Sequence, residues 1–154
     1  MTYDIVIDPN NNTLYCKRNN KTYNIASGDI YGKHHSHPYY TPVGETKIVE
    51  KRKVGGKFSP AFLRMGFLTL PNVNIRKSAK PYLIHGPMYY LKPLDKNGKF
   101  KDGGRLSKGC IRFYENELME FFNITKVGDK VLVKEYNDKK INDWVKKYSR
   151  NRLR

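Results

Sequence analysis

Residues 106–112 read Leu-Ser-Lys-Gly-Cys-Ile-Arg, and residues 84–86, earlier in the chain, read Ile-His-Gly. A free cysteine has a pKa of about 8.5, so it is mostly protonated near neutral pH unless a base or a positive charge lies beside it. One cysteine and one histidine are sufficient for acyl transfer. These two stretches therefore indicate a nucleophile, Cys110, with His85 as its base.

The glycine before the cysteine fits the second requirement of such a site. Gly109 lets the backbone approach a substrate closely, and the amides of residues 108–110 are expected to converge on a forming oxyanion. A structural interpretation is also open, because a cysteine between Gly and Ile is often a small buried hydrophobe. A histidine after Leu-Ile is likewise often a core residue at a strand end. The residue types alone fit both interpretations.

The chain is long enough for one domain and is strongly basic. It has 154 residues, of which 38% are apolar, so we expect a single compact unit with tails. Thirty Lys and Arg against fourteen Asp and Glu give a net charge of +16. This charge favours anionic partners such as nucleic acid, an anionic membrane or a cell-wall polymer, although it also fits a role in solubility alone.

The sequence shows neither a membrane span nor an export signal. No run of residues approaches the ~18 consecutive apolar residues that a membrane span needs. The first residues, Met-Thr-Tyr-Asp-Ile-Val-Ile-Asp, lack the charged and apolar regions of a signal peptide. We therefore expect a soluble chain with no visible export address.

The cysteines and histidines do not indicate a disulfide network or a metal centre. Only Cys16 and Cys110 occur, and Cys16 lies in an expected strand, where a structural thiol is typical. The one histidine cluster is His34-His35-Ser36-His37, whose Gly, Pro and Tyr neighbours indicate an exposed loop. We expect no disulfide, no metal and no cofactor.

Alternating apolar residues separated by turn clusters predict a mainly β domain. The expected strands cover residues 3–7, 13–17, 21–25, 45–53, 61–70, 82–84 and 130–136. Gly66 is expected to mark a bulge or a close backbone approach within its strand. The strand at 82–84 would deliver His85 at its end, where a rigid sheet can position a catalytic side chain.

Three further segments complete the prediction. Residues 87–105 contain Pro93, Asn97-Gly98 and Gly103-Gly104, and a connection of this length predicts a mobile flap over the site. Residues 115–123 predict the one internal helix, with an apolar face. In residues 137–154, apolar Ile141, Trp144, Val145 and Tyr148 recur at helical spacing among many Lys and Arg. This basic amphipathic helix could lie on an anionic surface or dock on the domain, and we favour docking.

The order of these pieces resembles the L,D-transpeptidase catalytic domain, the YkuD-type fold, over nearly all of residues 3–136. Members of that family carry a His-Gly or His-Ser step at a strand end and then a Ser/Thr-x-Gly-Cys-x-Arg/Asn step. Here these are His85-Gly86 and Ser107-Lys108-Gly109-Cys110-Ile111-Arg112, with weaker similarities at Ser27-Gly28 and Thr41-Pro42-Val43-Gly44. The resemblance implies a β-sandwich or barrel-like fold, with a catalytic domain at 1–136 and a basic C-terminal helix at 137–154.

The resemblance also implies a role for each motif residue. Cys110 is the nucleophile, His85 is the base that takes its proton, and the Gly86 carbonyl orients the imidazole. Ser107 supports the loop, and the amides around Gly109 and Cys110 receive the oxyanion. Arg112 stands where the family arginine could hold a substrate carboxylate or brace the site, although a surface ion pair is the alternative.

Two features depart from the family pattern. Lys108 stands where the family most often has His, and its charge is expected to lower the pKa of Cys110. The interval from His85 to Cys110 is also longer than usual, and the extra length falls within residues 87–105.

By resemblance, the substrate is a peptidoglycan stem peptide and the site of action is the cell wall or periplasm. Cys110 would attack an L-to-D peptide bond, expel the terminal D-amino acid and form a thioester. An amine acceptor would make the chain a transpeptidase, and water would make it an L,D-carboxypeptidase. The alternative from another class is a non-catalytic basic module that binds nucleic acid or cell-wall polymer. We expect stem peptides rather than nucleic acid as the partner, and a monomer.

Overall fold

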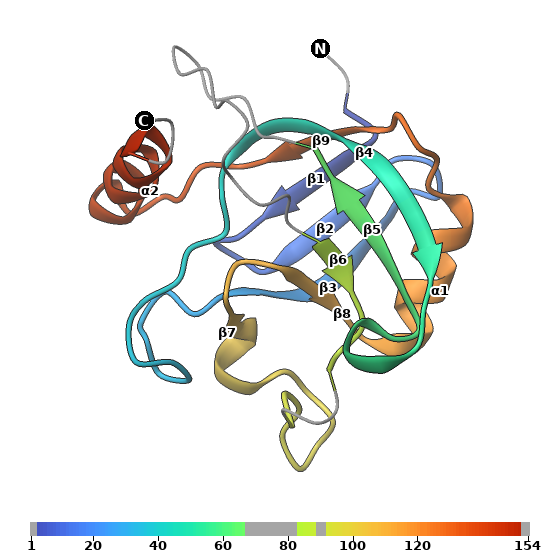
Figure 1. The fold of residues 1–154 in the computed structure, drawn as a ribbon, viewed down its shortest axis with the longest axis horizontal. Helices are drawn as coiled ribbons and strands as arrows, with labels where there is room; N and C mark the ends of the chain where they lie inside the picture. Colours follow the sequence, from blue (N-terminus) through green and yellow to red (C-terminus); the bar gives the residue numbers. More distant parts are fainter. Residues whose placement is uncertain (1–2, 67–82, 89–91, 152–154) are drawn as a thin grey trace.

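Nine described strands build a barrel in the computed structural model of this chain (Figure 1). The structure describes residues 3–66, 83–88 and 92–151. The strands are β1 (Ile5–Asp8), β2 (Thr13–Cys16), β3 (Lys21–Gly28), β4 (Gly44–Lys53), β5 (Ala61–Met65), β6 (Leu83–His85), β7 (Arg105–Ser107), β8 (Ile111–Phe113) and β9 (Lys130–Val133). Their order is β2-β1-β9-β4-β5-β6-β8-β3, and the pairing of β3 with β2 closes the barrel. The short strand β7 joins the outer side of β3 in parallel.

The first hairpin shows how local sequence produces this sheet. Asp8 ends β1, and its side chain accepts a hydrogen bond from the Asn10 amide at 2.9 Å, which closes the turn into β2. Apolar residues alternate along both strands, so Ile5, Ile7 and Leu14 all face the interior and are at most 1% exposed. Burial of one face fixes the register, because a slip of one residue would expose the whole apolar set.

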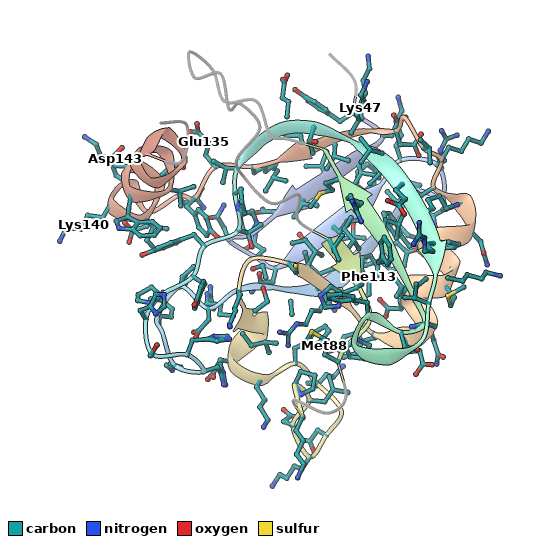
Figure 2. The ribbon with its side chains drawn as sticks, in the orientation of Figure 1. Lys47, Met88, Phe113, Glu135, Lys140 and Asp143 are labelled. Carbon is teal, nitrogen blue, oxygen red and sulfur yellow. The ribbon has the colours of Figure 1, made fainter. Side chains whose placement is uncertain are left out.

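The helix α1 (Glu115–Ile124) covers one end of the barrel, as the periodicity of 115–123 predicts. Phe113, at the end of β8, stacks on Phe121 of α1 with ring centroids 5.0 Å apart, and both rings are fully buried (Figure 2). Thr125 ends the helix by donating its hydroxyl hydrogen to the Phe121 carbonyl at 2.7 Å. This aromatic contact ties the strand that follows Cys110 to the core.

The C-terminal segment forms the helix α2 (Lys139–Asn151), which lies beside the barrel (Figure 1). Val145 is 3% exposed in the core, and the Trp144 ring contacts Tyr40 with centroids 4.1 Å apart. Lys140 and Asp143 lie on the opposite, exposed side (Figure 2). The apolar stripe of this basic helix is thus used for packing on the domain. Within the described residues, no helix combines the length and the apolarity needed to cross a bilayer.

The segment 92–104 of the flap expected at 87–105 is anchored by packed aromatic residues, whereas residues 89–91 lie outside the described residues and the mobility of the flap stays a prediction. A bridge between Leu94 and Phe100 closes a turn, and Phe100 stacks on Tyr114 at 4.1 Å. The Phe100 amide also donates to the Tyr114 hydroxyl at 2.8 Å. Phe100 and Leu106 form a small second core with Ala26 of β3. The sequence shows only the turn residues of this segment, because Tyr114, the residue that anchors it, follows Cys110 along the chain.

Other boundaries also differ from the sequence analysis. The strand expected at 61–70 is present as β5, which ends at Met65, and residues 67–70 lie outside the described residues. Tyr82, the first residue of the strand expected at 82–84, also lies outside them. The closing strand ends at Val133 rather than at residue 136. The close approach expected at Gly66 is confirmed, because a Cβ there would lie 3.2 Å from the side chain of Val49, and the register of β4 shifts nearby, between Ile48 and Glu50. The short strands β7 and β8, which flank the Cys110 loop, were not predicted, because three-residue strands carry little periodicity.

Candidate active site

His85 ends β6, a three-residue strand held between β5 and β8. Its side chain is 1% exposed, and its Nδ1 lies 2.7 Å from the carbonyl oxygen of Gly86. A carbonyl can only accept a hydrogen bond, so Nδ1 carries the proton of the neutral ring and Nε2 carries the lone pair. A backbone group therefore fixes the orientation of the His85 ring.

The surroundings of His85 require glycine at position 86. A Cβ at Gly86 would lie 1.9 Å from the carbonyl oxygen of Ser59, which no side chain tolerates. The neighbouring Phe58 ring packs edge-on against the His85 imidazole with centroids 5.0 Å apart. Gly86 thus lets the 58–60 segment close over His85 and shield it from water.

Cys110 immediately precedes β8, which runs parallel to β6. Within this pair His85 lies opposite Arg112, and Cys110 is two residues before Arg112. Side chains alternate between the two faces of a strand, so Cys110, Arg112 and His85 are expected on one face. Cys110 is half-buried, whereas Cys16 is fully buried in the core.

Ser107 braces the loop that carries Cys110. Its hydroxyl donates to the carbonyl oxygen of Cys110 at 2.6 Å and accepts from the Gly109 amide at 3.0 Å. Gly109 has a φ of +119°, a conformation that side-chain-bearing residues rarely adopt. The Gly109 amide was expected to bind an oxyanion with its neighbours, but it is directed to Ser107 instead.

Thr41 holds the same loop from the opposite side. Its hydroxyl donates to the Gly109 carbonyl at 3.0 Å and accepts from the Gly28 amide at 2.9 Å. Its own amide donates to the hydroxyl of Tyr136 at 3.1 Å. Burial raises the pKa of Tyr136 to about 12, so this hydroxyl stays neutral at physiological pH. In a trans peptide the carbonyl and the following amide point in opposite directions, so the Cys110 amide points away from Thr41.

Arg112 and Lys108 take different positions beside the nucleophile. Arg112 is 5% exposed, so it lies inside the site rather than in a surface ion pair. Lys108 is exposed, and its ammonium lies over the Tyr39 ring, 5.8 Å from the centroid. Lys108 thus contacts the loop at 29–40, which packs beside the Cys110 segment through the hydrogen bond from the Asp29 amide to the Ser107 carbonyl.

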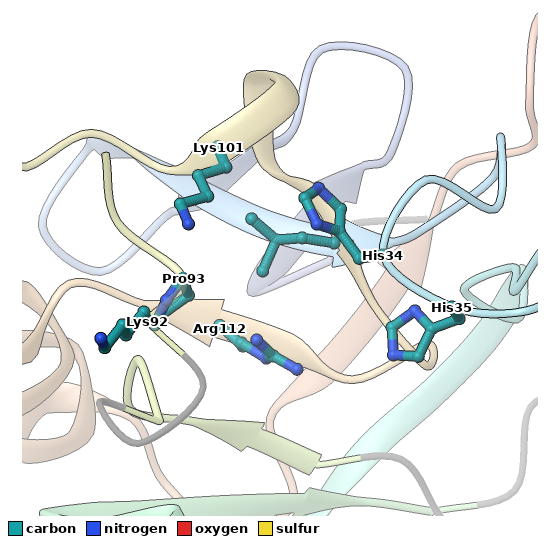
Figure 3. A pocket seen from close by; sticks show the side chains of 7 residues that line it. His34, His35, Lys92, Pro93, Lys101 and Arg112 are labelled. Carbon is teal, nitrogen blue, oxygen red and sulfur yellow. The ribbon is translucent and has the colours of Figure 1, made fainter. Parts of the chain in front are cut away.

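A pocket of about 170 Å³ opens next to this segment (Figure 3). Its lining residues come from four parts of the chain: His34, His35, Lys92, Pro93, Lys101, Leu106 and Arg112. In Figure 3 the two histidines approach from one side and Lys92 with Pro93 from the other, with Arg112 between them. The pocket is therefore polar, cationic and connected to the nucleophile through Arg112.

The histidines of this pocket are ordered by two carboxylates. His35 Nδ1 lies 3.0 Å from a carboxylate oxygen of Asp29, which also accepts from the amides of Lys33 and His34. Burial alone would raise the pKa of Asp29, but these hydrogen bonds hold the pKa below its ordinary value. His34 Nε2 pairs with the Asp102 carboxylate. The exposed loop expected here is confirmed for most of residues 31–38, and the signal missed in the sequence was an acid five to six residues before two histidines.

A metal centre is not indicated by the described side chains. Among these residues, no group of three or more His, Cys, Asp or Glu is arranged to hold a metal ion. The groups in hand are a thiol, an oriented imidazole, backbone amides and several cations. Together they suit nucleophilic acyl transfer, which uses the chain's own side chains.

Comparisons with known proteins agree with the fold and the motifs. Residues 2–133 match the family model of the L,D-transpeptidase catalytic domain, YkuD. The chain is 30% identical over 135 residues to the protein YkuD of Bacillus subtilis (strain 168), a match that covers 85% of this chain. The chain spans 65% of the length of that relative.

Solved structures share the architecture at low sequence identity. An L,D-transpeptidase from Mycobacterium tuberculosis H37Rv superposes with a TM-score of 0.57 at 18% identity, over 85% of this chain and 57% of that one. An L,D-transpeptidase of Enterococcus faecium superposes with a TM-score of 0.59 at 17% identity, over 87% and 50%. The family match covers most of the chain and includes both the histidine step and the cysteine step. The chain therefore belongs to the YkuD family of L,D-transpeptidase catalytic domains.

Proposed function

We propose that this protein is a cysteine acyltransferase that cross-links peptidoglycan stem peptides through a thioester on Cys110. The observation that carries the proposal is the 2.7 Å contact between His85 Nδ1 and the Gly86 carbonyl. This contact directs the lone pair of Nε2 to the face that Cys110 shares. Family membership supports peptidoglycan as the substrate class and the cell wall as the place of action.

In the first half-reaction His85 Nε2 takes the thiol proton, and the sulfur attacks the carbonyl carbon of the L-to-D peptide bond. The carbonyl oxygen becomes an oxyanion in the tetrahedral intermediate. When the intermediate collapses, the carbon–nitrogen bond breaks and the amine of the terminal D-amino acid leaves with the proton from Nε2. The product is an acyl-enzyme thioester on Cys110.

The oxyanion is assigned to the amides of Cys110 and Lys108, since the Gly109 amide is occupied by Ser107. Thr41 holds the carbonyl of the Gly109–Cys110 peptide, and Ser107 holds the peptides on either side of it, so the Cys110 amide keeps a fixed direction. Such preorganised donors stabilise the charge only where it develops. We infer that Thr41 is a positioning residue that acts through the nucleophile loop.

In the second half-reaction His85 takes a proton from the acceptor, which attacks the thioester and releases the Cys110 sulfur. An amine on a neighbouring stem gives a cross-link, and water gives a shortened stem. The family supports the first outcome in general. The L,D-carboxypeptidase outcome uses the same residues and differs only in the acceptor.

A covalent probe tests the nucleophile. Incubation with a carbapenem should add the mass of one probe molecule to the intact protein, and Cys110→Ala should abolish this adduct. Cys16→Ala is the matched control, because it removes a buried cysteine of the same chain and should label normally. A wild-type protein that stays unmodified while a known L,D-transpeptidase labels would favour a non-catalytic basic binding module.

A product assay tests the acceptor. Purified protein is incubated with tetrapeptide stems, and the products are separated by mass. Cross-linked dimers identify a transpeptidase, whereas tripeptide alone identifies a carboxypeptidase. His85→Gln should suppress both products, because an amide cannot shuttle the proton.

A further inference from the structure

The cationic pocket beside Arg112 has no part in the reaction described above, yet its charge points to a ligand. Lys92, Lys101 and Arg112 are permanently cationic at neutral pH. The two nearby carboxylates, of Asp29 and Asp102, are fewer than these three cations. The pocket therefore stays cationic even when both of its histidines are neutral, and it favours an anion.

The histidines add directional donors to this charge. Asp29 engages one ring nitrogen of His35, and Asp102 engages one ring nitrogen of His34. The carboxylates thus fix the orientation of both rings, and the second nitrogen of each ring donates to a ligand when the ring is protonated. Asp102 is also 3.7 Å from the Lys33 ammonium, so the loop at 29–40 is tied to the segment 92–104. Both walls of the pocket are held together by these ion pairs.

The size of the pocket limits the ligand to a small group. Its volume is about 170 Å³. A cavity of about 150 Å³ is enough to hold benzene, a ligand of six non-hydrogen atoms. One small amino acid with its carboxylate has a similar number of atoms. A long polymer such as nucleic acid would fit only through a single protruding group.

The location of the pocket relates it to the scissile bond. Arg112 is two residues after Cys110 on a strand, where alternate Cα atoms are roughly 6.6 Å apart. A group bound against Arg112 therefore lies within about one or two substrate residues of the attacked carbonyl. Two carboxylates of a stem peptide could reach it: the terminal carboxylate of the leaving D-residue, or a side-chain carboxylate on the residue that supplies the carbonyl.

We propose that the pocket lined by His34, His35, Lys92, Lys101 and Arg112 is a carboxylate subsite that selects donor stems with a free carboxylate next to the scissile bond. This inference rests on the proposed function, since it assigns part of the same substrate. Pairs between lysine or arginine and a carboxylate are stronger than neutral hydrogen bonds. A stem in which this carboxylate is an amide should therefore bind at least about tenfold more weakly.

The binding test uses the Cys110→Ala protein, which cannot turn over, and three synthetic tetrapeptide stems. One stem has free carboxylates, one has a C-terminal carboxamide, and one has carboxamides in place of its side-chain carboxylates. Calorimetry should show weaker binding for one of the two amidated stems. The stem that weakens identifies the source of the carboxylate.

Two lysine variants in the Cys110→Ala protein connect this discrimination to the pocket. Lys101→Met keeps the apolar stem of the side chain and removes the charge, so it should bind the free and amidated stems equally. Lys96→Met is the matched control, because Lys96 lies in the same segment, is exposed and does not line the pocket. Its discrimination should equal that of the Cys110→Ala parent. Equal binding of all three stems by that parent would overturn the inference.

A second readout separates this inference from the proposed function. N-acetyl-D-alanine is titrated into the wild-type protein while the histidine ring signals are followed by NMR. The signals of His34 and His35 should shift and saturate, whereas that of His37, which does not line the pocket, should not. N-acetyl-D-alanine amide should leave all three unchanged. If Cys110 is acylated by the carbapenem but neither compound shifts His34 and His35, the subsite is wrong and the acyltransferase stands. If the shifts occur without acylation, the subsite stands and the acyltransferase is wrong.

Discussion

Replacing Thr41 with valine tests whether the nucleophile loop is held from outside the motif. Thr41 is 1% exposed, and its hydroxyl bridges the Gly28 amide and the Gly109 carbonyl. Valine has nearly the same shape, so Thr41→Val removes these two hydrogen bonds and leaves no cavity. The hydrogen bond from the backbone amide of residue 41 to Tyr136 is retained.

The expected cost follows from two buried groups that lose their partner at once. A buried donor or acceptor without a partner costs about 1–3 kcal/mol, so the free energy of unfolding should fall by about 2–4 kcal/mol after some relaxation. This is a large part of the ~5–15 kcal/mol stability of a typical domain, but the variant should still fold. The freed Gly109 carbonyl can rotate with its peptide, which turns the Cys110 amide away from the oxyanion. Loss of one such donor slows catalysis by about 10²–10³, so partial misalignment should slow acylation by at least about tenfold.

Two measurements and one control variant complete this test. Urea denaturation followed by circular dichroism gives the unfolding free energy, and intact-mass spectrometry gives the rate at which a carbapenem acylates Cys110. Thr41→Ser keeps the hydroxyl and loses one methyl group, so it should cost about 1 kcal/mol and acylate at nearly the wild-type rate. If Thr41→Val loses stability but acylates at the wild-type rate, Thr41 supports the fold and does not position the nucleophile. If neither quantity changes, the reasoning from these hydrogen bonds is refuted.

Two further variants and one chemical modification test other parts of the molecule. Ser107→Ala leaves the Gly109 amide and the Cys110 carbonyl without their shared partner, so acylation of Cys110 should slow by at least about tenfold. An unchanged acylation rate would contradict the inference that Ser107 braces the Cys110 loop. Burial raises the pKa of Cys16, so iodoacetamide at neutral pH should modify Cys110 at least about tenfold faster than Cys16. Equal rates of modification at the two cysteines, measured by peptide mapping, would argue against an activated Cys110. Burial would raise the pKa of Asp129, but the hydrogen bonds from Arg18 and the Lys126 amide hold this pKa below the ordinary 3.8. The ionised Asp129 carboxylate therefore stabilises the fold above pH 3.8. This stabilisation is lost as the pH falls through the lower pKa of the folded state. Asp129→Asn should therefore cost about 1–3 kcal/mol at pH 7 and flatten the acid side of the stability curve, whereas a parallel curve would contradict this cause.

Much of the architecture was predictable because it depends on local patterns. The hairpin at the N-terminus, the long strand β4 and both helices follow from apolar periodicity and turn residues, and the structure contains each of them. The β-barrel fold and the family were also predictable, because ordered motifs imply an ordered set of elements, and both are confirmed. The pairing of β6 with β8 was not predictable, because parallel strands are joined by long connections rather than by a hairpin turn, and such connections leave no local signal in the sequence.

The pocket shows where sequence reasoning ends. His34 and His35 lie in the exposed loop that the sequence predicted, but the sequence did not show that this loop lines a pocket. Asp102, which pairs with His34, is 68 residues away along the chain. The sequence also did not show how the segment 92–104 is anchored, because its partner Tyr114 follows Cys110 along the chain.

Sequence alone predicted the candidate reactive groups of this protein, Cys110 and His85, from their residue types together with the order of the motifs that carry them. The contact of His85 with the carbonyl of the adjacent Gly86 was expected from the motif. The hydrogen bond from Thr41 to the Gly109 carbonyl and the convergence of cations around Arg112 depend on the tertiary structure. The last two contacts join residues far apart along the chain, and local periodicity holds no information about which distant segments will become neighbours.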